Sequence, residues 1–191
     1  FGIDISGSDC QNISLKNNTI DNITTAIDVW DGPESIHISE NDIIDSDNGI
    51  ITNDSREVSI FNNNLKNYSD WGISLRHTDN CEIKGNHLIS KNQSGIYAIS
   101  IVYANFTVVE NNTLGENNIG IFSWGMNSND LQIIGNIFDG PYAGMLIDTM
   151  DSVLISENSF RNIHAGAYIE NCNSVDFIKN TIESPYEGVV M

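Results

Sequence analysis

A short phrase of alternating apolar residues, followed by an asparagine, recurs along the whole chain. It reads "IHISENDI" at residues 36–43, and copies such as "VSIFNNNL" at 58–65 and "TVVENNTL" at 107–114 share its pattern. The asparagines of successive copies are 22 to 26 residues apart. A period of this length identifies a repeat protein, in which each repeat packs only against its neighbours. The repeated asparagines are Asn18, Asn41, Asn63, Asn86, Asn112, Asn136, Asn158 and Asn180.

A second phrase, a small residue followed by an apolar one, keeps the same period. It occurs at Gly2-Ile3, Ala26-Ile27, Gly49-Ile50, Gly72-Ile73, Gly95-Ile96, Gly120-Ile121, Gly144-Met145, Gly166-Ala167 and Gly188-Val189. After the small residue, side chains are expected to alternate between the core and the surface, as on a strand. The intervening segments are rich in Asn, Asp, Ser and Gly, which argues against the helical return of a leucine-rich repeat. Each period is therefore predicted to be one coil of two or three short strands with tight corners.

The repeated asparagine is predicted to lie at an inside corner of each coil. Asparagines of successive coils would be about 4.8 Å apart, which lets their amides hydrogen bond along the axis. The same amides would satisfy corner backbone groups that cannot join a strand ladder. We interpret the eight asparagines as structural residues that form an inward ladder.

The two phrases together, as in "GISLRHTDNCEIKGNHL" at 72–88, resemble the right-handed parallel β-helix repeat of the pectate-lyase-like superfamily. The resemblance extends over essentially the whole chain. It implies an all-β fold, a right-handed single-stranded parallel β-helix of about eight coils, with one domain over residues 1–191. The superfamily includes polysaccharide lyases, pectin hydrolases, alginate epimerases, phage tailspikes, surface adhesins, NosD-like copper-maturation proteins and many archaeal and bacterial surface proteins. The resemblance is therefore specific for the fold and says little about function.

The charge balance limits the partners that we expect. Eight Lys and Arg against 26 Asp and Glu give a net charge of −18, whereas phosphate binding needs clustered basic residues, so nucleic acid is excluded as a partner. No apolar run is long enough for a membrane-spanning helix. The chain opens at Phe1 and closes at Met191 within a phrase, so we expect a segment of a longer chain. Further coils, a capping element or copies of the chain are expected at its ends.

Cysteines and asparagine sequons bear on the compartment. The three cysteines, Cys10, Cys81 and Cys172, are interpreted as small apolar residues, because the predicted coils place the outer two far apart. Sequons indicate an exported glycoprotein at the cell surface or outside the cell. The acidity favours a salt-adapted, archaeal source. The candidate glycosylation sites are Asn12, Asn17, Asn22, Asn53, Asn67, Asn92, Asn105 and Asn111.

The outward positions after each small residue form columns along the predicted rod. The first column changes from acidic to aromatic along the chain, the second holds two tryptophans, and a third lies two residues before the glycine. Flat rings in rows suit a linear sugar polymer, whereas the alternative is a face covered by a loop, a neighbouring domain or another protomer. The predicted binding residues are Tyr97, Phe122 and Tyr168 in the first column, Trp30 and Trp124 in the second, and Tyr142 and Tyr186 in the third.

One polar cluster is a candidate for catalysis. Asp54 is expected one coil away from Arg76 and His77. Uronate polymers need a cation at the carboxylate and a base at the neighbouring carbon, and these residues could supply both. The alternative is an ordinary surface ladder of charges. The Asn-Thr-Asp and Gly-His-Gly patterns of pectin hydrolases and the Asp-Pro-His-Asp pattern of alginate epimerases are absent.

Metal binding has weaker support in the sequence. The histidines fall in different columns, so no copper site is expected, and no cofactor is predicted. Calcium is the one alternative, with oxygen ligands from Asp4 and Asp28 or from Asp45 and Asp47. The leading function is an extracellular, non-catalytic stalk or carbohydrate-binding module that contacts a polysaccharide or surface glycan. The alternatives are a polysaccharide lyase, epimerase or glycoside hydrolase domain and a structural subunit that stacks end to end.

Overall fold

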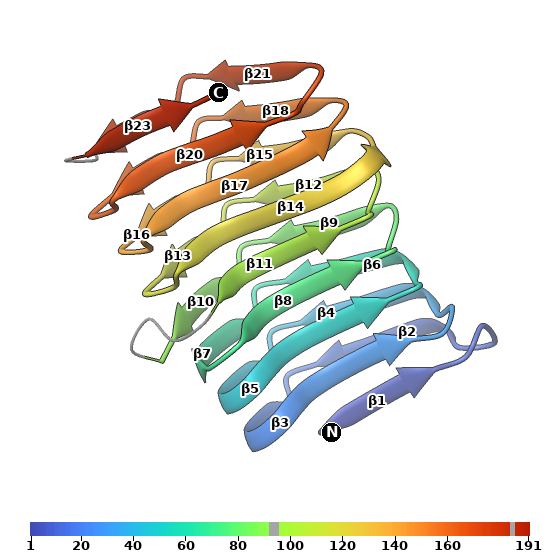
Figure 1. The fold of residues 1–191 in the computed structure, drawn as a ribbon. Helices are drawn as coiled ribbons and strands as arrows, with labels where there is room; N and C mark the ends of the chain where they lie inside the picture. The colour runs from blue at the N-terminus through green and yellow to red at the C-terminus, as the bar shows by residue number, and fades with distance from the viewer. Residues whose placement is uncertain (92–95, 184–185) are drawn as a thin grey trace.

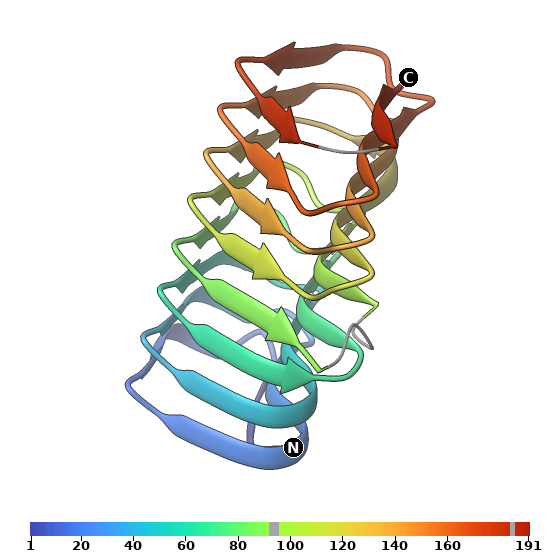
Figure 2. The ribbon, with the colours of Figure 1, turned by 90° about the vertical axis from the view of Figure 1, so that its left-hand side faces the viewer.

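The computed structural model describes residues 1–91, 96–183 and 186–191. Its 23 strands form one 15-stranded and one 8-stranded sheet, the strand pairs are parallel, and the described residues contain no helix. Successive coils stack into a rod with the two chain ends at opposite ends (Figures 1 and 2). The predicted all-β, right-handed parallel β-helix is therefore confirmed.

Each coil contributes strands to three faces. The back sheet consists of β2 (Gln11–Lys16), β4 (Glu34–Ser39), β6 (Arg56–Phe61), β9 (Cys81–Lys84), β12 (Thr107–Glu110), β15 (Leu131–Ile134), β18 (Val153–Ser156) and β21 (Val175–Ile178). The front strands are β1 (Ile3–Ser6), β3 (Thr19–Trp30), β5 (Asp42–Asn53), β8 (Trp71–Arg76), β11 (Tyr97–Val102), β14 (Ile119–Ser128), β17 (Ala143–Met150), β20 (Ala165–Glu170) and β23 (Glu187–Val190). The side strands are β7 (Asn64–Tyr68), β10 (His87–Ser90), β13 (Thr113–Gly115), β16 (Ile137–Asp139), β19 (Ser159–Arg161) and β22 (Thr181–Glu183). Because β3 and β5 continue from the side to the front, these two faces form one sheet.

The core is a set of apolar columns that run along the axis. On the front strands, Ile27, Ile50, Ile73 and Ile121 belong to one column and are fully buried. Each side chain stacks on its equivalent in the next coil, about 4.8 Å away. The apolar alternation of the sequence therefore buries one face of every strand, and this burial is the main favourable contribution to folding.

The corners use the left-handed backbone region. One corner column contains Asp31, Asp54, His77 and Tyr103, with φ between 48° and 66°. Asn, Asp and His are several-fold enriched at positive φ compared with other residues that carry a side chain. The corner geometry therefore explains why the segments between the apolar phrases are rich in Asn and Asp.

The repeated asparagines form continuous hydrogen bonds between the coils. Asn86 is typical of them: its Oδ1 accepts from both the backbone N and the Nδ2 of Asn63, at 2.8 and 3.0 Å. Its Nδ2 donates to the carbonyl of Ile60 at 2.8 Å and to Oδ1 of Asn112 at 3.0 Å. Amide-to-amide bonds of this kind join each asparagine from Asn18 onward to the next, as far as Asn180. Every polar atom of the buried amide thus has a partner.

The coil that contains β11 departs from the register expected from Gly95-Ile96. Ile99 pairs with Ile73 and Ile121 in the core column, so Ala98 occupies the small position. Ile96 is 42% exposed, and Gly95 lies outside the described residues. The interval from Asn86 to the next ladder asparagine is 26 residues, the longest in the chain. Because of the extra residues, both Gly95-Ile96 and Ala98-Ile99 match the phrase of a small residue followed by an apolar one. As a consequence, Ser100 takes the outward position that the sequence assigned to Tyr97.

We predict that Asn86→Ala lowers the free energy of unfolding by roughly 2–4 kcal/mol, because two N–H groups of Asn63 lose their acceptor in the core and the carbonyl of Ile60 loses its side-chain donor. Guanidinium unfolding followed by circular dichroism measures this change. Asn118→Ala, at an exposed asparagine outside the ladder, is the matched control and should change stability by about 0.5 kcal/mol or less. Equal effects of the two substitutions would contradict a structural role for the ladder.

We predict that Gly144→Ala destabilises the coil by roughly 1–3 kcal/mol through overpacking. The added methyl group would collide with the carbonyl oxygen of Gly166 and with the ring of Phe160. That ring is held by stacking on Phe138, with ring centroids 4.5 Å apart. Gly188→Ala is the control, because a methyl group there meets no atom within 4 Å. The midpoints of thermal unfolding of the two variants should therefore differ clearly.

Candidate functional site

A depression of about 440 Å³ lies on the outer surface of the front strands β3, β5, β8 and β11. Its rim carries Trp30 and Trp71, which are 43% and 36% exposed. Its volume is within the range of small-molecule sites. We call this depression the groove. The residues that line it are Asp28, Trp30, Ile51, Asn53, Trp71, Ser74, Arg76, Ser100 and Val102.

The strand register explains why the surface is hollow at this point. Ser74 and Ser100 are adjacent in the first outward column, where their neighbours on the flanking coils are Ile51 and Phe122. Two small side chains between larger ones leave a floor that is lower than the rest of the column. The groove is thus produced by residue size on a regular sheet.

The two tryptophans are held in different ways at the rim. The indole Nε1 of Trp30 donates a 2.8 Å hydrogen bond to Oδ1 of Asp4. Trp71 begins β8 and pairs with Tyr97 on the next coil. Sequence reasoning missed Trp71, because it lies immediately before the small residue Gly72 and outside the three columns considered. The exposure of a large ring at a strand start becomes apparent only from the structure.

Aromatic side chains continue beyond the groove along the rod. Tyr97 stacks on Phe122 with ring centroids 4.7 Å apart and an angle of 15° between the rings. The two predicted residues are therefore in contact. Tyr97 is nevertheless the strand partner of Trp71, and Ser100 is the residue that pairs with Phe122. Leu146 separates Phe122 from Tyr168 in their outward column. Tyr168 donates to a carboxylate oxygen of Glu187, and this bond raises the pKa of the phenol to about 12.

The structure divides the predicted catalytic cluster between two places. Arg76 is an outward residue of β8 and lines the groove. Asp54 and His77 lie at the following corner, with Nδ1 of His77 3.3 Å from Oδ1 of Asp54. Tyr103, which the sequence analysis did not single out, stacks on His77 at 5.2 Å and meets the edge of Trp124 at 4.8 Å. Trp124 therefore belongs to a corner cluster beside the groove.

The third predicted column is a separate stack of rings. His164 lies between Tyr142 and Tyr186, with centroid distances of 4.6 and 4.5 Å. Tyr142 is 56% exposed and Tyr186 is 74% exposed. None of these three residues lines the groove, so the seven predicted binding residues do not form one surface.

Two features of the groove are unusual electrostatically. Burial, and to a lesser degree the nearby carboxylate of Asp4, raise the pKa of Asp28 above its ordinary value. The side-chain oxygen of Asn53 is buried and has no hydrogen-bond partner among the described residues. A buried acceptor without a partner is unfavourable.

The predicted glycosylation sites differ in accessibility. Asn53 is half-buried in the wall of the groove, and Asn105 donates from Nδ2 to Oδ1 of Asp79 at 3.0 Å. Asn92 lies outside the described residues. The remaining candidates are exposed: Asn12, Asn17, Asn22, Asn67 and Asn111.

Within residues 1–91, 96–183 and 186–191, no group of three or more His, Cys, Asp or Glu side chains is arranged to hold a metal ion. The carboxylates of Asp45 and Asp47, two of the candidate calcium ligands, accept hydrogen bonds at Oδ1 from Asn67 and Ser69 at 3.1 and 3.0 Å. None of the described segments is a helix long and apolar enough to cross a membrane.

Comparison with known proteins identifies a family and several structural relatives. The sequence profile of the family described as periplasmic copper-binding protein (NosD) matches residues 2–140 and 96–191. The Streptococcus pneumoniae surface protein and adhesin PfbA has a TM-score of 0.74 and 13% identity, over 98% of this chain and 68% of that chain. DFA-IIIase from Arthrobacter chlorophenolicus A6 has a TM-score of 0.63 and 12% identity, over 94% and 60%. The periplasmic alginate epimerase AlgG has a TM-score of 0.54 and 14% identity, over 87% and 51%. No curated protein matches the chain by sequence.

These likenesses show the fold alone, because the identities are low, and they include an adhesin and an epimerase. The copper in the family description can be tested against the residues present. Copper sites use thiolate, thioether and imidazole ligands. Cys81 is buried, donates to the carbonyl of Thr78 at 3.4 Å, and has its pKa raised to about 12 by burial, which disfavours the thiolate. Together with the lack, in the described part of the chain, of any group of three His, Cys, Asp or Glu side chains arranged to hold a metal, this shows that the thiolate and imidazole donors do not fit a copper site.

We predict that Asp28→Asn increases stability at neutral pH and has little effect in acid. Because the folded-state pKa of Asp28 lies above its unfolded value, the natural protein loses stability as the pH rises through that folded pKa. The variant lacks this loss. Unfolding midpoints in guanidinium, measured from acidic to neutral pH, should diverge as the pH increases. Parallel curves for the variant and the natural protein would contradict the raised pKa.

Proposed function

This chain belongs to the NosD family, and we propose that it is a non-catalytic carbohydrate-binding module that acts outside the cytoplasm. The observation that carries the proposal is the groove on the front strands, with Trp30 and Trp71 exposed at its rim. The family description and the adhesin fold of PfbA support a periplasmic or surface location.

The chemistry of the groove suits a sugar ring. Exposed indoles present flat apolar surfaces on which the C–H face of a sugar can stack, and contiguous exposed aromatic residues mark binding surfaces. The hydroxyls of Ser74 and Ser100 lie at the floor, and Asn53 and Arg76 supply an amide and a cation at one side. A few placed polar groups in a largely apolar hollow are typical of a ligand site.

The groove is extended by neighbouring rings, and this favours a polymer over a single sugar. Trp71 and Tyr97 are paired on adjacent coils, and Tyr97 stacks on Phe122. Rings on consecutive coils are spaced by about 4.8 Å along the rod. A linear polysaccharide that runs along the axis would therefore stack on the indoles of the groove and then meet the edges of Tyr97 and Phe122, whose faces pack against each other.

We predict that Trp30→Ala and Trp71→Ala each weaken polysaccharide binding by about tenfold or more, because each removes a stacking surface of the groove. Isothermal titration calorimetry against neutral and acidic soluble polysaccharides, with calcium and with chelator, measures the effect. Ile178→Ala is the control, because Ile178 is 44% exposed on the back sheet, away from the groove. Unchanged binding in both tryptophan variants, or no binding by the natural protein, would overturn the proposal.

A second candidate function is supported by the pair at the corner. His77 and Asp54 are 3.3 Å apart, and Arg76 of the groove directly precedes His77, as base chemistry on a uronate would need. If the chain is a lyase or an epimerase, incubation with alginate or polygalacturonate should give unsaturated ends or an altered uronate composition. His77→Ala should then abolish the product without abolishing binding. Absence of product with the natural protein would remove this candidate and leave the binding module intact.

A further inference from the structure

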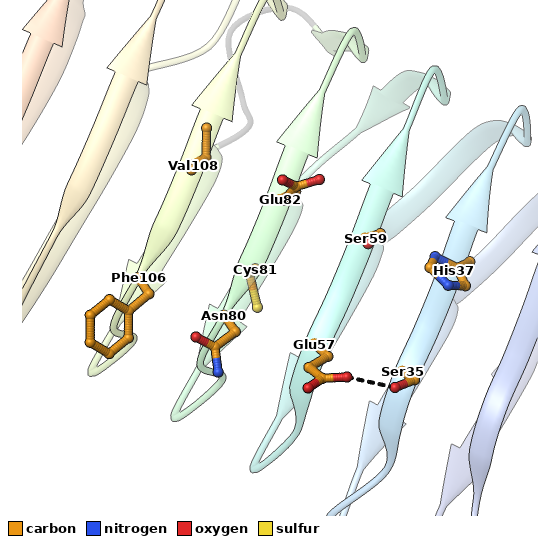
Figure 3. Close-up of a pocket in the computed structure, with 9 residues that line it drawn as sticks. All are labelled: Ser35, His37, Glu57, Ser59, Asn80, Cys81, Glu82, Phe106 and Val108. Atoms are coloured by element: carbon orange, nitrogen blue, oxygen red, sulfur yellow. Dashed lines mark hydrogen bonds between the residues drawn. The ribbon is translucent and has the colours of Figure 1, made fainter.

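A second hollow, of about 370 Å³, lies on the outer face of the back sheet (Figure 3). It extends over β4, β6, β9 and β12 and therefore lies on the opposite side of the rod from the groove. Figure 3 shows a row of side chains at the strand starts, Ser35, Glu57, Asn80 and Phe106. Because the volume is at the lower end of the range for small-molecule sites, it suits a ligand of one ring.

The floor of this hollow is again set by residue size. His37, Ser59 and Glu82 are adjacent in one outward column of the back sheet. The small Ser59 lies between two longer side chains, which leaves the space that Figure 3 shows. The hollow is thus bounded by a polar column on one side and by the strand-start row on the other.

Phe106 is the residue that the fold does not explain. Its φ is 52°, and its side chain is 55% exposed. A bulky residue at positive φ is strained, and a phenyl ring that is more than half exposed gains less from burial than a ring in the core. The equivalent positions on other coils are all polar, and those at positive φ are Asn12, Ser35, Glu57, Asn80 and Asp130. Strain of this kind is concentrated at functional sites, so the ring at this corner is expected to contact a ligand.

Besides Phe106, the hollow carries hydrogen-bonding groups, among them two carboxylates and the imidazole of His37. Ser35 donates from Oγ to Oε2 of Glu57 at 2.7 Å, which fixes that carboxylate at the rim. Asn80 adds an amide beside Phe106. The lining residues include the carboxylates of Glu57 and Glu82 and neither Lys nor Arg. Carboxylates and amides accept hydrogen bonds from sugar hydroxyls, whereas an anionic sugar would meet the like charge of Glu57; the charge of Glu82 is paired with Lys84 at 3.1 Å.

We propose that this hollow is a second binding site, which holds one uncharged sugar unit with its face on Phe106 and its hydroxyls bonded to Glu57 and Asn80. Its chemistry differs from that of the groove, where Arg76 supplies a cation. With both sites the rod has two sugar-binding faces and can join two glycan chains. The second site does not depend on the groove, and either can be absent without the other.

The test uses NMR titration of the ¹⁵N-labelled chain with cellotetraose, mannotetraose and chitotetraose as neutral probes and tetragalacturonate as the anionic probe. At least one neutral probe should shift the backbone amides of Glu57, Asn80 and Phe106, and tetragalacturonate should not. Phe106→Asn should weaken that binding by about tenfold, because the stacking surface is lost. The same substitution should leave the thermal midpoint unchanged or higher, because Asn tolerates positive φ.

Two further variants separate the possible roles of the ring. Phe106→Tyr keeps the ring and should retain binding, and Trp30→Ala, which alters only the groove, should leave these amide shifts unchanged. The proposal is overturned if no neutral probe shifts the three amides, or if Phe106→Asn binds as tightly as the natural protein. A lower thermal midpoint for Phe106→Asn would also overturn it, because the ring would then stabilise the coil.

Discussion

The structure depends on hydrogen bonding between successive coils at a fixed spacing of about 4.8 Å. Every residue of a coil must be compatible with its equivalent above and below, because the parallel strands align like with like. The asparagine ladder extends this bonding to a corner that the strands leave, with each amide bonded to the next coil and to a backbone carbonyl. The fold therefore needs similar residues at equivalent interior positions, and the residues that differ between coils lie on the outer surface.

The candidate binding surfaces lie where the residues of an outward column change in size, or where an aromatic residue replaces a polar one. Ser74 and Ser100 interrupt a column of larger residues and form the floor of the groove, and Ser59 does the same on the back sheet. At the corners, positive φ selects Asn and Asp, so Tyr103 and Phe106 stand out as large rings at positions where polar residues are less strained. Both rings belong to the same coil and border opposite faces of the rod.

The period, the fold class and the corner positions could be predicted from the sequence because each follows from a pattern repeated in every coil. The side-chain contacts made by the longest coil could not, because they depend on the register of that coil. Two phrases in that coil fit the repeat, at 95–96 and 98–99, and only the packing of Ile99 between Ile73 and Ile121 distinguishes them. The pairing of Asp54 with His77 followed from the period, whereas Trp71 and Tyr103 lay outside the predicted columns.

The central claim, that the groove binds carbohydrate, is tested most directly by the indole N–H resonances of the three tryptophans. A soluble polysaccharide that binds the chain would first be cut into oligosaccharides. These would then be titrated into the protein while the indole resonances are recorded by NMR. Trp30 and Trp71 line the groove, whereas Trp124 contacts Tyr103 at the neighbouring corner and serves as an internal control. The account predicts saturable shifts for Trp30 and Trp71 that exceed the shift of Trp124. Shifts confined to Trp124, or none in any indole while binding occurs, would contradict it.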